Sequence, residues 1–119
     1  MKAALNGVPQ LSTADGWWAE GYNGHNGWTI ATPAVESDAP ETNAAAAGQL
    51  YSLLEQEVVP TYYTRDSTGM PRQWIAMMKQ AMRVAGLQFT ARRMLIEYVR
   101  TCYVPSITGD PVPDAPPTA

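Results

Sequence analysis

The amine of Lys2 is the side chain in this sequence with the clearest potential for covalent chemistry. A lysine can form an imine with an aldehyde when its amine is neutral, which requires a partly desolvated site. Residues 1–5 read as helix and Asn6-Gly7 as its end, since both residues tolerate the left-handed conformation. Lys2 would then stand in a first turn, where free N–H groups can bind an anion such as phosphate. Position alone favours an ordinary solvated lysine, so the argument for Lys2 rests on its neighbours.

The other reactive side chains are weaker candidates. Asp15 and Glu20 are spaced so that a pair of glycosidase carboxylates is conceivable, but nothing in the sequence sets their separation. His25 is the only histidine and lies in a glycine-rich segment without a Cys or His partner, so no metal site is predicted. Cys102, the only cysteine, falls on an apolar helix face, which favours a core residue over a nucleophile. The sequence therefore assigns no catalytic residue.

Aromatic residues are concentrated between residues 15 and 28 and allow two interpretations. A sugar-stacking surface would make the chain a small carbohydrate-binding module, and it would use Trp17, Trp18, Trp28 and Tyr22. Tryptophans can equally fill a core beneath an irregular loop, and we favour that interpretation.

Two short strands and three helices are expected to position these residues. The strands are predicted over 8–12 and 28–30, with a loop over 15–28. The first complete helix is predicted over 41–59, with Asp38 as its N-cap, Pro40 in its first turn and Pro60 at its end. Because residues 1–5 are too few to nucleate a helix alone, we expect the chain to begin inside a longer helix.

The second helix is predicted from Pro71 to Ala85, ended by Gly86, after a turn over 65–69. Its apolar stripe consists of Trp74, Met77, Met78, Ala81 and Met82. This stripe favours a core, although it could also dock on a partner and make the chain a helical interaction subunit.

The third helix is predicted to start at a Thr90 cap, run to Tyr103 and stop at Pro105. Its predicted buried face consists of Leu95, Tyr98, Val99 and Cys102. Residues 105–119 are proline-rich and are expected to be a disordered tail.

Length and charge narrow the function classes. A chain of 119 residues with net charge −3 is one small domain or a piece of a larger one. Its basic half, 61–119, has no run of bases longer than two, so nucleic acid is not an expected partner. No stretch approaches the ~20 apolar residues of a membrane span. A single cysteine and no recognisable signal peptide favour the cytoplasm.

Two blocks of the sequence resemble one family. MKAALNGVP, then LS, then DGWWAEGYNG resemble the stretch around the cofactor lysine of the α-glucan (glycogen/maltodextrin) phosphorylases, with Lys2 at the lysine position. EQEVVPTYY, then RD and further single residues to Tyr98, resemble that family's C-terminal helices. The resemblance covers about residues 1–30 and 50–104, and the double tryptophan is typical of bacterial and archaeal members.

The resemblance implies a parent enzyme of α/β class, with two Rossmann-like lobes of the glycosyltransferase B type. Residues 1–104 would be part of its C-terminal lobe, mostly helical with two short strands. The parent reaction would be phosphorolysis of an α-1,4-glucan by orthophosphate to glucose 1-phosphate, with Lys2 holding pyridoxal 5′-phosphate as an imine. The remaining site residues lie upstream in the family, so the isolated chain is expected to be inactive, with a missing N-terminal part as a candidate partner chain.

Overall fold

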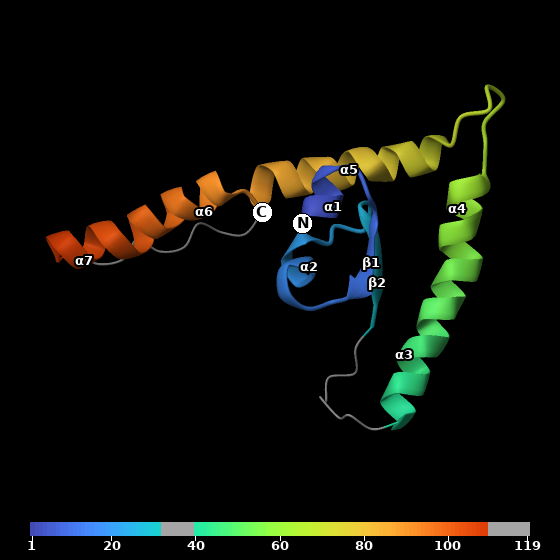
Figure 1. Ribbon diagram of the computed structural model, residues 1–119, viewed down its shortest axis with the longest axis horizontal. Coiled ribbons are helices and arrows are strands. Elements are labelled where there is room, and N and C mark those ends of the chain that lie inside the picture. Colours follow the sequence, from blue (N-terminus) through green and yellow to red (C-terminus); the bar gives the residue numbers. More distant parts are fainter. Residues whose placement is uncertain (32–39, 110–119) are drawn as a thin grey trace.

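The computed structural model describes residues 1–31 and 40–109, which form a small N-terminal unit and three long helical rods (Figure 1). The chain measures 58 × 45 × 22 Å with a radius of gyration of 18.7 Å. A compact chain of this length would have a radius of gyration of about 13.5 Å. The open shape means that much of the helical surface has no counterpart within the chain.

The N-terminal unit contains α1 (Lys2–Leu5), β1 (Gln10–Thr13), α2 (Gly16–Gly21) and β2 (Gly27–Ile30). The two strands pair in parallel, with Gln10 opposite Gly27 and Thr13 opposite Ile30. The predicted helix end is confirmed, because Gly7 has a φ of +79°. Both predicted strands exist, although β1 begins and ends later than expected.

The prediction of a loop over 15–28 was wrong in its first half, because α2 occupies residues 16–21. Asp15 has the extended backbone of an N-cap, and its carbonyl accepts hydrogen bonds from the amides of Trp18 and Ala19 at 3.0 and 3.2 Å. The glycines suggested a loop, but the helix turns Trp18 into the core. Tertiary burial therefore outweighs local propensity here.

Prolines do not end the first and third rods as predicted. The first rod consists of α3 (Pro40–Leu53), a π-helical segment η1 (Leu54–Val58) and α4 (Val59–Tyr63). The third consists of α6 (Ala91–Tyr98), a π-helical segment η2 (Val99–Tyr103) and α7 (Val104–Thr108), which ends at Gly109 with φ +75°.

In both rods a π turn comes directly before the Val-Pro pair. Proline normally breaks a helix because it lacks an N–H and its ring clashes with the carbonyl four residues earlier. The wider π turn changes that spacing, so each helix continues through Pro60 or Pro105. The predicted cap Asp38 lies outside the described residues. Of the predicted disordered tail, 105–119, residues 105–108 are helical and 110–119 lie outside the described residues.

The second rod is α5 (Arg72–Gln88), which crosses the N-terminal unit. Gly86 was predicted to end this helix but lies inside it. The end comes instead at Phe89, whose amide donates to the Ala85 carbonyl at 3.2 Å and whose ring meets Trp17 edge-on at 5.3 Å. The Thr90 cap is confirmed, since its hydroxyl accepts a hydrogen bond from the Arg93 amide at 3.2 Å.

The core lies where α1 meets α5. Ala4, Ala81 and Ala85 contact one another there, with Trp17 against them. Trp18, Trp28, Ile30 and Val84 are also buried. The predicted apolar stripe of α5 is therefore partly correct, because Ala81 is buried while Met82 is 41% exposed.

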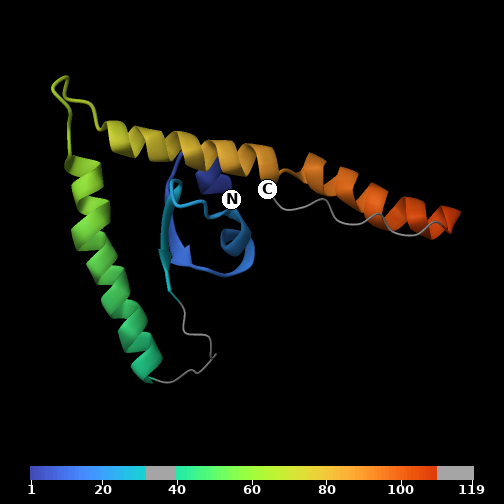
Figure 2. The ribbon, with the colours of Figure 1, turned by 180° about the vertical axis from the view of Figure 1, so that it is seen from behind.

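The predicted buried face of the third helix is a clear error. Leu95, Tyr98 and Val99 are 57%, 49% and 39% exposed, and Cys102 is exposed as well. The apolar residues do recur at helical spacing. Within residues 1–31 and 40–109, however, the principal contacts of α6 and α7 are with η2 of the same rod. Figure 2 shows the same rod from behind, again projecting beyond the N-terminal unit.

We predict that Gly27→Ala disrupts the strand pair. A Cβ at Gly27 would lie 2.0 Å from the backbone oxygen of Gln10, which cannot move without breaking the register. The expected loss is about 1–3 kcal/mol in free energy of unfolding, measured by urea denaturation. Gly24→Ala is the matched control, since that glycine also has positive φ but no neighbour within 4 Å. Equal losses in both variants would contradict this steric account.

Candidate functional site

Lys2 is the first residue of α1 and its side chain is exposed. Two local contacts fix the backbone around it. The Lys2 carbonyl accepts a hydrogen bond from the Asn6 side chain at 2.8 Å, and the Leu5 amide donates to the Met1 carbonyl at 3.0 Å. Ala4 then anchors the short helix against α5. The position of Lys2 is therefore set by α5, a distant part of the sequence.

The described residues leave the Lys2 side chain exposed, and neither of two cavities in this part of the chain includes it. One cavity of about 250 Å³ is lined by Asn23, Gln80, Arg83, Val84, Leu87 and Gln88. Another of about 300 Å³ is lined by Gly86, Leu87, Thr90, Arg92, Arg93 and Ile96. Lys2 lines neither of them. The described residues around Lys2 do not by themselves fit pyridoxal 5′-phosphate. That cofactor needs hydrogen-bond donors for its phosphate and a desolvated lysine amine.

The tryptophans of the N-terminal unit fill the core, as the favoured interpretation predicted. Trp18 is 1% exposed and Trp28 is 7% exposed. Trp17 packs edge-on against both Trp18 and Phe89, at 5.4 and 5.3 Å between ring centroids. Two of the four rings proposed for sugar stacking are thus buried, and the structure does not support a carbohydrate-binding surface made from them.

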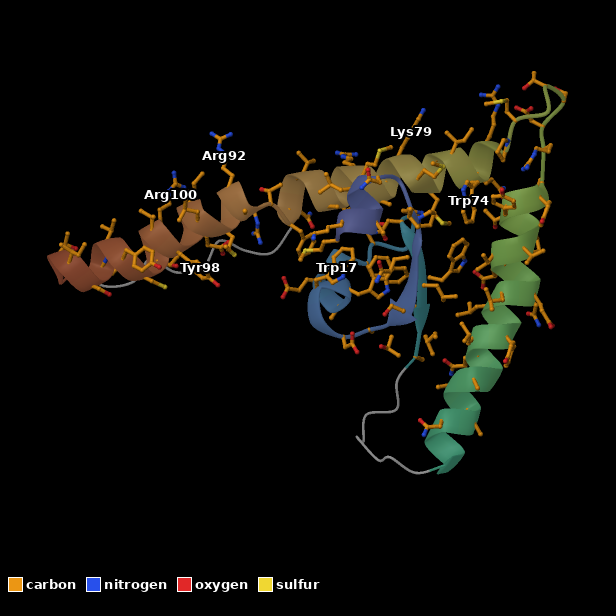
Figure 3. All side chains as sticks on the ribbon, viewed as in Figure 1. Trp17, Trp74, Lys79, Arg92, Tyr98 and Arg100 are labelled. Atoms are coloured by element: carbon orange, nitrogen blue, oxygen red, sulfur yellow. The ribbon has the colours of Figure 1, made fainter. Side chains whose placement is uncertain are left out.

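A second aromatic cluster joins β2 to the two rods beside it. The Trp74 ring lies 6.0 Å from Trp28 and 5.0 Å from Tyr62 of α4 (Figure 3). Arg65 stands over the Tyr62 ring at 5.7 Å, within the range of a cation–π contact. Sequence reasoning found Trp74 as part of a stripe but missed Tyr62, because the helix was expected to end before it.

Asn26 is a buried polar residue with a structural role, and sequence reasoning also missed it. It is 1% exposed, donates to the Gly21 carbonyl at 2.7 Å and accepts from the Asn23 amide at 3.1 Å. These bonds close the connection between α2 and β2, because a buried amide must find partners for both of its ends. The available signal was an asparagine directly before Gly27 in a glycine-rich stretch.

The remaining reactive candidates do not form a site. Asp15 and Glu20 are both exposed, and Asp15 accepts a hydrogen bond from the Thr13 hydroxyl at 2.9 Å. His25 is exposed, and its backbone amide donates to the Asn23 side chain. Over the described part of the chain, no group of three or more metal-ligating side chains gathers. Nor does any helix described here combine the length and apolarity needed to cross a membrane.

Asp66 organises the turn between α4 and α5. Its carboxylate accepts hydrogen bonds from the Thr68 hydroxyl at 2.6 Å and from the Met70 amide at 3.0 Å, and it pairs with the Arg72 guanidinium. The Thr68 hydroxyl, followed by Met70 and Arg72, holds the pKa of Asp66 well below its ordinary value. The turn predicted over 65–69 is confirmed, with Gly69 at φ +80° donating to the Asp66 carbonyl at 2.9 Å.

Comparison with known proteins identifies three informative relatives. The chain is 50% identical over 103 residues to a glycogen phosphorylase of Aquifex aeolicus, which covers 87% of the chain. It is 47% identical over 103 residues to a maltodextrin phosphorylase of Thermococcus litoralis, again 87% of the chain. It is 42% identical over 106 residues, 89% of the chain, to a glycogen phosphorylase of Mycobacterium tuberculosis.

The matches cover only 14%, 12% and 12% of these relatives, so the chain spans a small fraction of their length. No family model matches the chain. No solved structure matches it significantly.

The hydrogen bonds to Asp66 predict an acid-sensitive turn. Because the folded pKa lies below the unfolded one, the stabilisation is present above about pH 4 and is lost as the pH falls further. The amides of Thr68 and Met70 should therefore exchange hydrogen faster relative to their intrinsic rates as the pH drops from 6 towards 3. Asp66→Asn should remove that dependence, and Asp15→Asn should preserve it. Protection of these two amides that is unchanged by acid would contradict the assignment.

Proposed function

This chain corresponds to a segment of the glycogen/maltodextrin phosphorylase family, and we propose that it serves as the cofactor-lysine segment of such an enzyme. The parent reaction is the phosphorolysis of an α-1,4-glucan by orthophosphate to glucose 1-phosphate. The observation that carries the proposal is the 50% identity over 87% of the chain. In this proposal the chain is one part of the C-terminal lobe of a glycosyltransferase B type fold.

Lys2 is the residue proposed to hold pyridoxal 5′-phosphate in the assembled enzyme. The chain supplies the amine and positions it through the contact of α1 with α5. In this proposal the surrounding enclosure and the groups that hold phosphate come from the rest of the enzyme, because Lys2 is exposed among the described residues. No catalytic acid or base is assigned within the chain.

The proposed partner is the rest of a phosphorylase, as a preceding part of the same polypeptide or as a separate chain. The low fraction of the relatives that is matched and the open arrangement of the rods both support this proposal. A cytoplasmic location is consistent with a free, exposed Cys102 thiol, which a reducing compartment would preserve.

The proposal predicts that the isolated chain releases no glucose 1-phosphate from maltodextrin and orthophosphate. Activity should appear when the chain is mixed with Aquifex aeolicus glycogen phosphorylase from which the matching segment has been removed, together with pyridoxal 5′-phosphate. A coupled assay for glucose 1-phosphate measures both conditions. Release by the chain alone, or none from the mixture, would contradict the proposal.

Lys2→Ala sharpens the same test. The mixture containing this variant should lose activity, and borohydride reduction should no longer attach the cofactor to the chain, as read by mass spectrometry. Lys79→Ala is the matched control, because Lys79 is also an exposed lysine but points away from the N-terminal unit (Figure 3). Covalent cofactor on the Lys2→Ala chain would show that another amine holds it.

A further inference from the structure

A polar cavity lies between α5 and the connection from α2 to β2. Its volume is about 250 Å³, and its lining consists of Asn23, Gln80, Arg83, Val84, Leu87 and Gln88. The α5 residues of this lining recur at helical spacing, so they form one stripe along that helix. Ala81 and Ala85 belong to the neighbouring stripe, which is buried in the contact with α1. The cavity therefore uses a face of α5 that this contact leaves open.

The lining combines one positive charge with several carboxamides. Among the described residues around the cavity, Arg83 is the only charged one. Val84 and Leu87 add aliphatic surface, and the carboxamides come from Asn23, Gln80 and Gln88. Guanidinium and carboxamide groups together carry more N–H donors than acceptor oxygens. The lining therefore favours a small anion that also carries hydroxyl groups.

Arg83 is available to bind such a ligand. The ion pairs among the described residues join Arg72 to Asp66 and Arg93 to Glu97, so Arg83 has no acidic partner in this part of the chain. A guanidinium can donate two parallel hydrogen bonds to a phosphate, which gives both attraction and orientation.

Asn23 is held in place by its neighbours. Its carboxamide oxygen accepts a hydrogen bond from the His25 amide at 2.9 Å, and its backbone amide donates to the Asn26 side chain at 3.1 Å. Since the oxygen already has a partner, the NH₂ group of Asn23 is the part available to a ligand. Asn26 is itself buried and bonded to the Gly21 carbonyl, so this edge of the cavity is preorganised.

We infer that this cavity binds a small sugar phosphate. Arg83 holds the phosphate, and the carboxamides of Gln80 and Gln88 exchange hydrogen bonds with the sugar hydroxyls. Sites for drug-sized ligands measure about 300–1,000 Å³. A cavity of about 250 Å³ therefore suits one phosphorylated monosaccharide. Lys2 does not line the cavity, so this site is separate from the proposed cofactor position.

The other cavity beside α5 offers different chemistry. Arg92 and Arg93 line it, but Arg93 pairs with Glu97, and the Thr90 hydroxyl accepts a hydrogen bond from the Arg93 amide. Its other lining residues, which carry no polar side chain, are Gly86, Leu87 and Ile96. Because no carboxamide lines it, it is less suited to sugar hydroxyls than the first cavity.

An NMR titration of the full 119-residue chain with glucose 1-phosphate tests the inference. The side-chain N–H signals that should shift together and saturate are those of Asn23, Gln80, Arg83 and Gln88. The expected Kd is on the order of 1 mM, because the ligand is small and the site is partly open. Inorganic phosphate and glucose, titrated separately, should each bind at least about 10-fold more weakly, since each makes only part of the contacts.

Arg83→Gln removes the charge but keeps a helix-forming residue. It should weaken glucose 1-phosphate binding by about 10-fold or more, the effect of losing a hydrogen bond to a charged group. Lys79→Gln is the matched control, because it removes the same charge from α5 but Lys79 projects away from the N-terminal unit (Figure 3). It should change the affinity less than about two-fold. Far-UV circular dichroism checks that both variants stay helical.

Gln88→Met tests the sugar half of the site, since it removes an exposed carboxamide and leaves the charge in place. It should weaken glucose 1-phosphate by about three-fold or more and leave the affinity for inorganic phosphate unchanged.

Saturable shifts at the lining side chains, with selective loss in Arg83→Gln and Gln88→Met, would establish the site. Absence of saturation, shifts centred on residues 90–93, or equal losses in Arg83→Gln and Lys79→Gln would overturn it. Inorganic phosphate that binds as tightly as glucose 1-phosphate would also overturn it, because a simple anion would then suffice. None of these outcomes involves phosphorolysis, so each leaves the proposed function standing.

Discussion

The close contact between α1 and α5 is the constraint on which the arrangement of this chain depends. Ala4, Ala81 and Ala85 have side chains small enough for the two helices to approach closely, and all three are almost fully buried. A helix of four residues has no stability of its own, so α1 exists because α5 holds it. Since Lys2 is part of α1, the one residue proposed for chemistry is positioned by residues about eighty positions away.

The core around the contact of α1 with α5 involves few residues. Trp17, Trp18 and Phe89 cover one side of it, and the Trp28–Trp74–Tyr62 cluster ties the first rod to the second. Beyond these clusters the rods are half-exposed or exposed over most of their length. Because apolar burial is the dominant favourable term in folding, the rods gain little from the rest of this chain. This is the pattern expected of a segment whose partners for packing lie in another part of an enzyme.

Local signals in the sequence predicted the local features well. Gly7 ends α1, Thr90 caps α6, and the turn around Asp66 forms because a carboxylate can accept several nearby donors. Long-range effects were not predictable in the same way. The helix α2 forms among glycines because it buries Trp18, and the rods pass through Pro60 and Pro105 because π turns precede them.

The same distinction between local signals and long-range contacts applies to the candidate site. The proposal for Lys2 rests on the residues around it in the sequence, whereas the described residues leave its side chain exposed. The face of Leu95, Tyr98 and Val99 was correctly recognised as apolar, yet its burial could not follow from spacing alone. Periodicity shows which side of a helix is suited to burial and carries no information about what covers it.

Hydrogen exchange on the isolated chain tests most directly whether the α1–α5 contact organises it. The account predicts that the amides of Ala81, Val84 and Ala85 exchange most slowly, because they lie under the buried core. Amides along the third rod, 91–108, should exchange at rates close to those of an unfolded chain, since among the described residues this rod makes its principal contacts only with itself. Amides of the third rod that are protected as strongly as those of Ala81 and Ala85 would contradict the account, because this rod would then be a stable part of an independent fold.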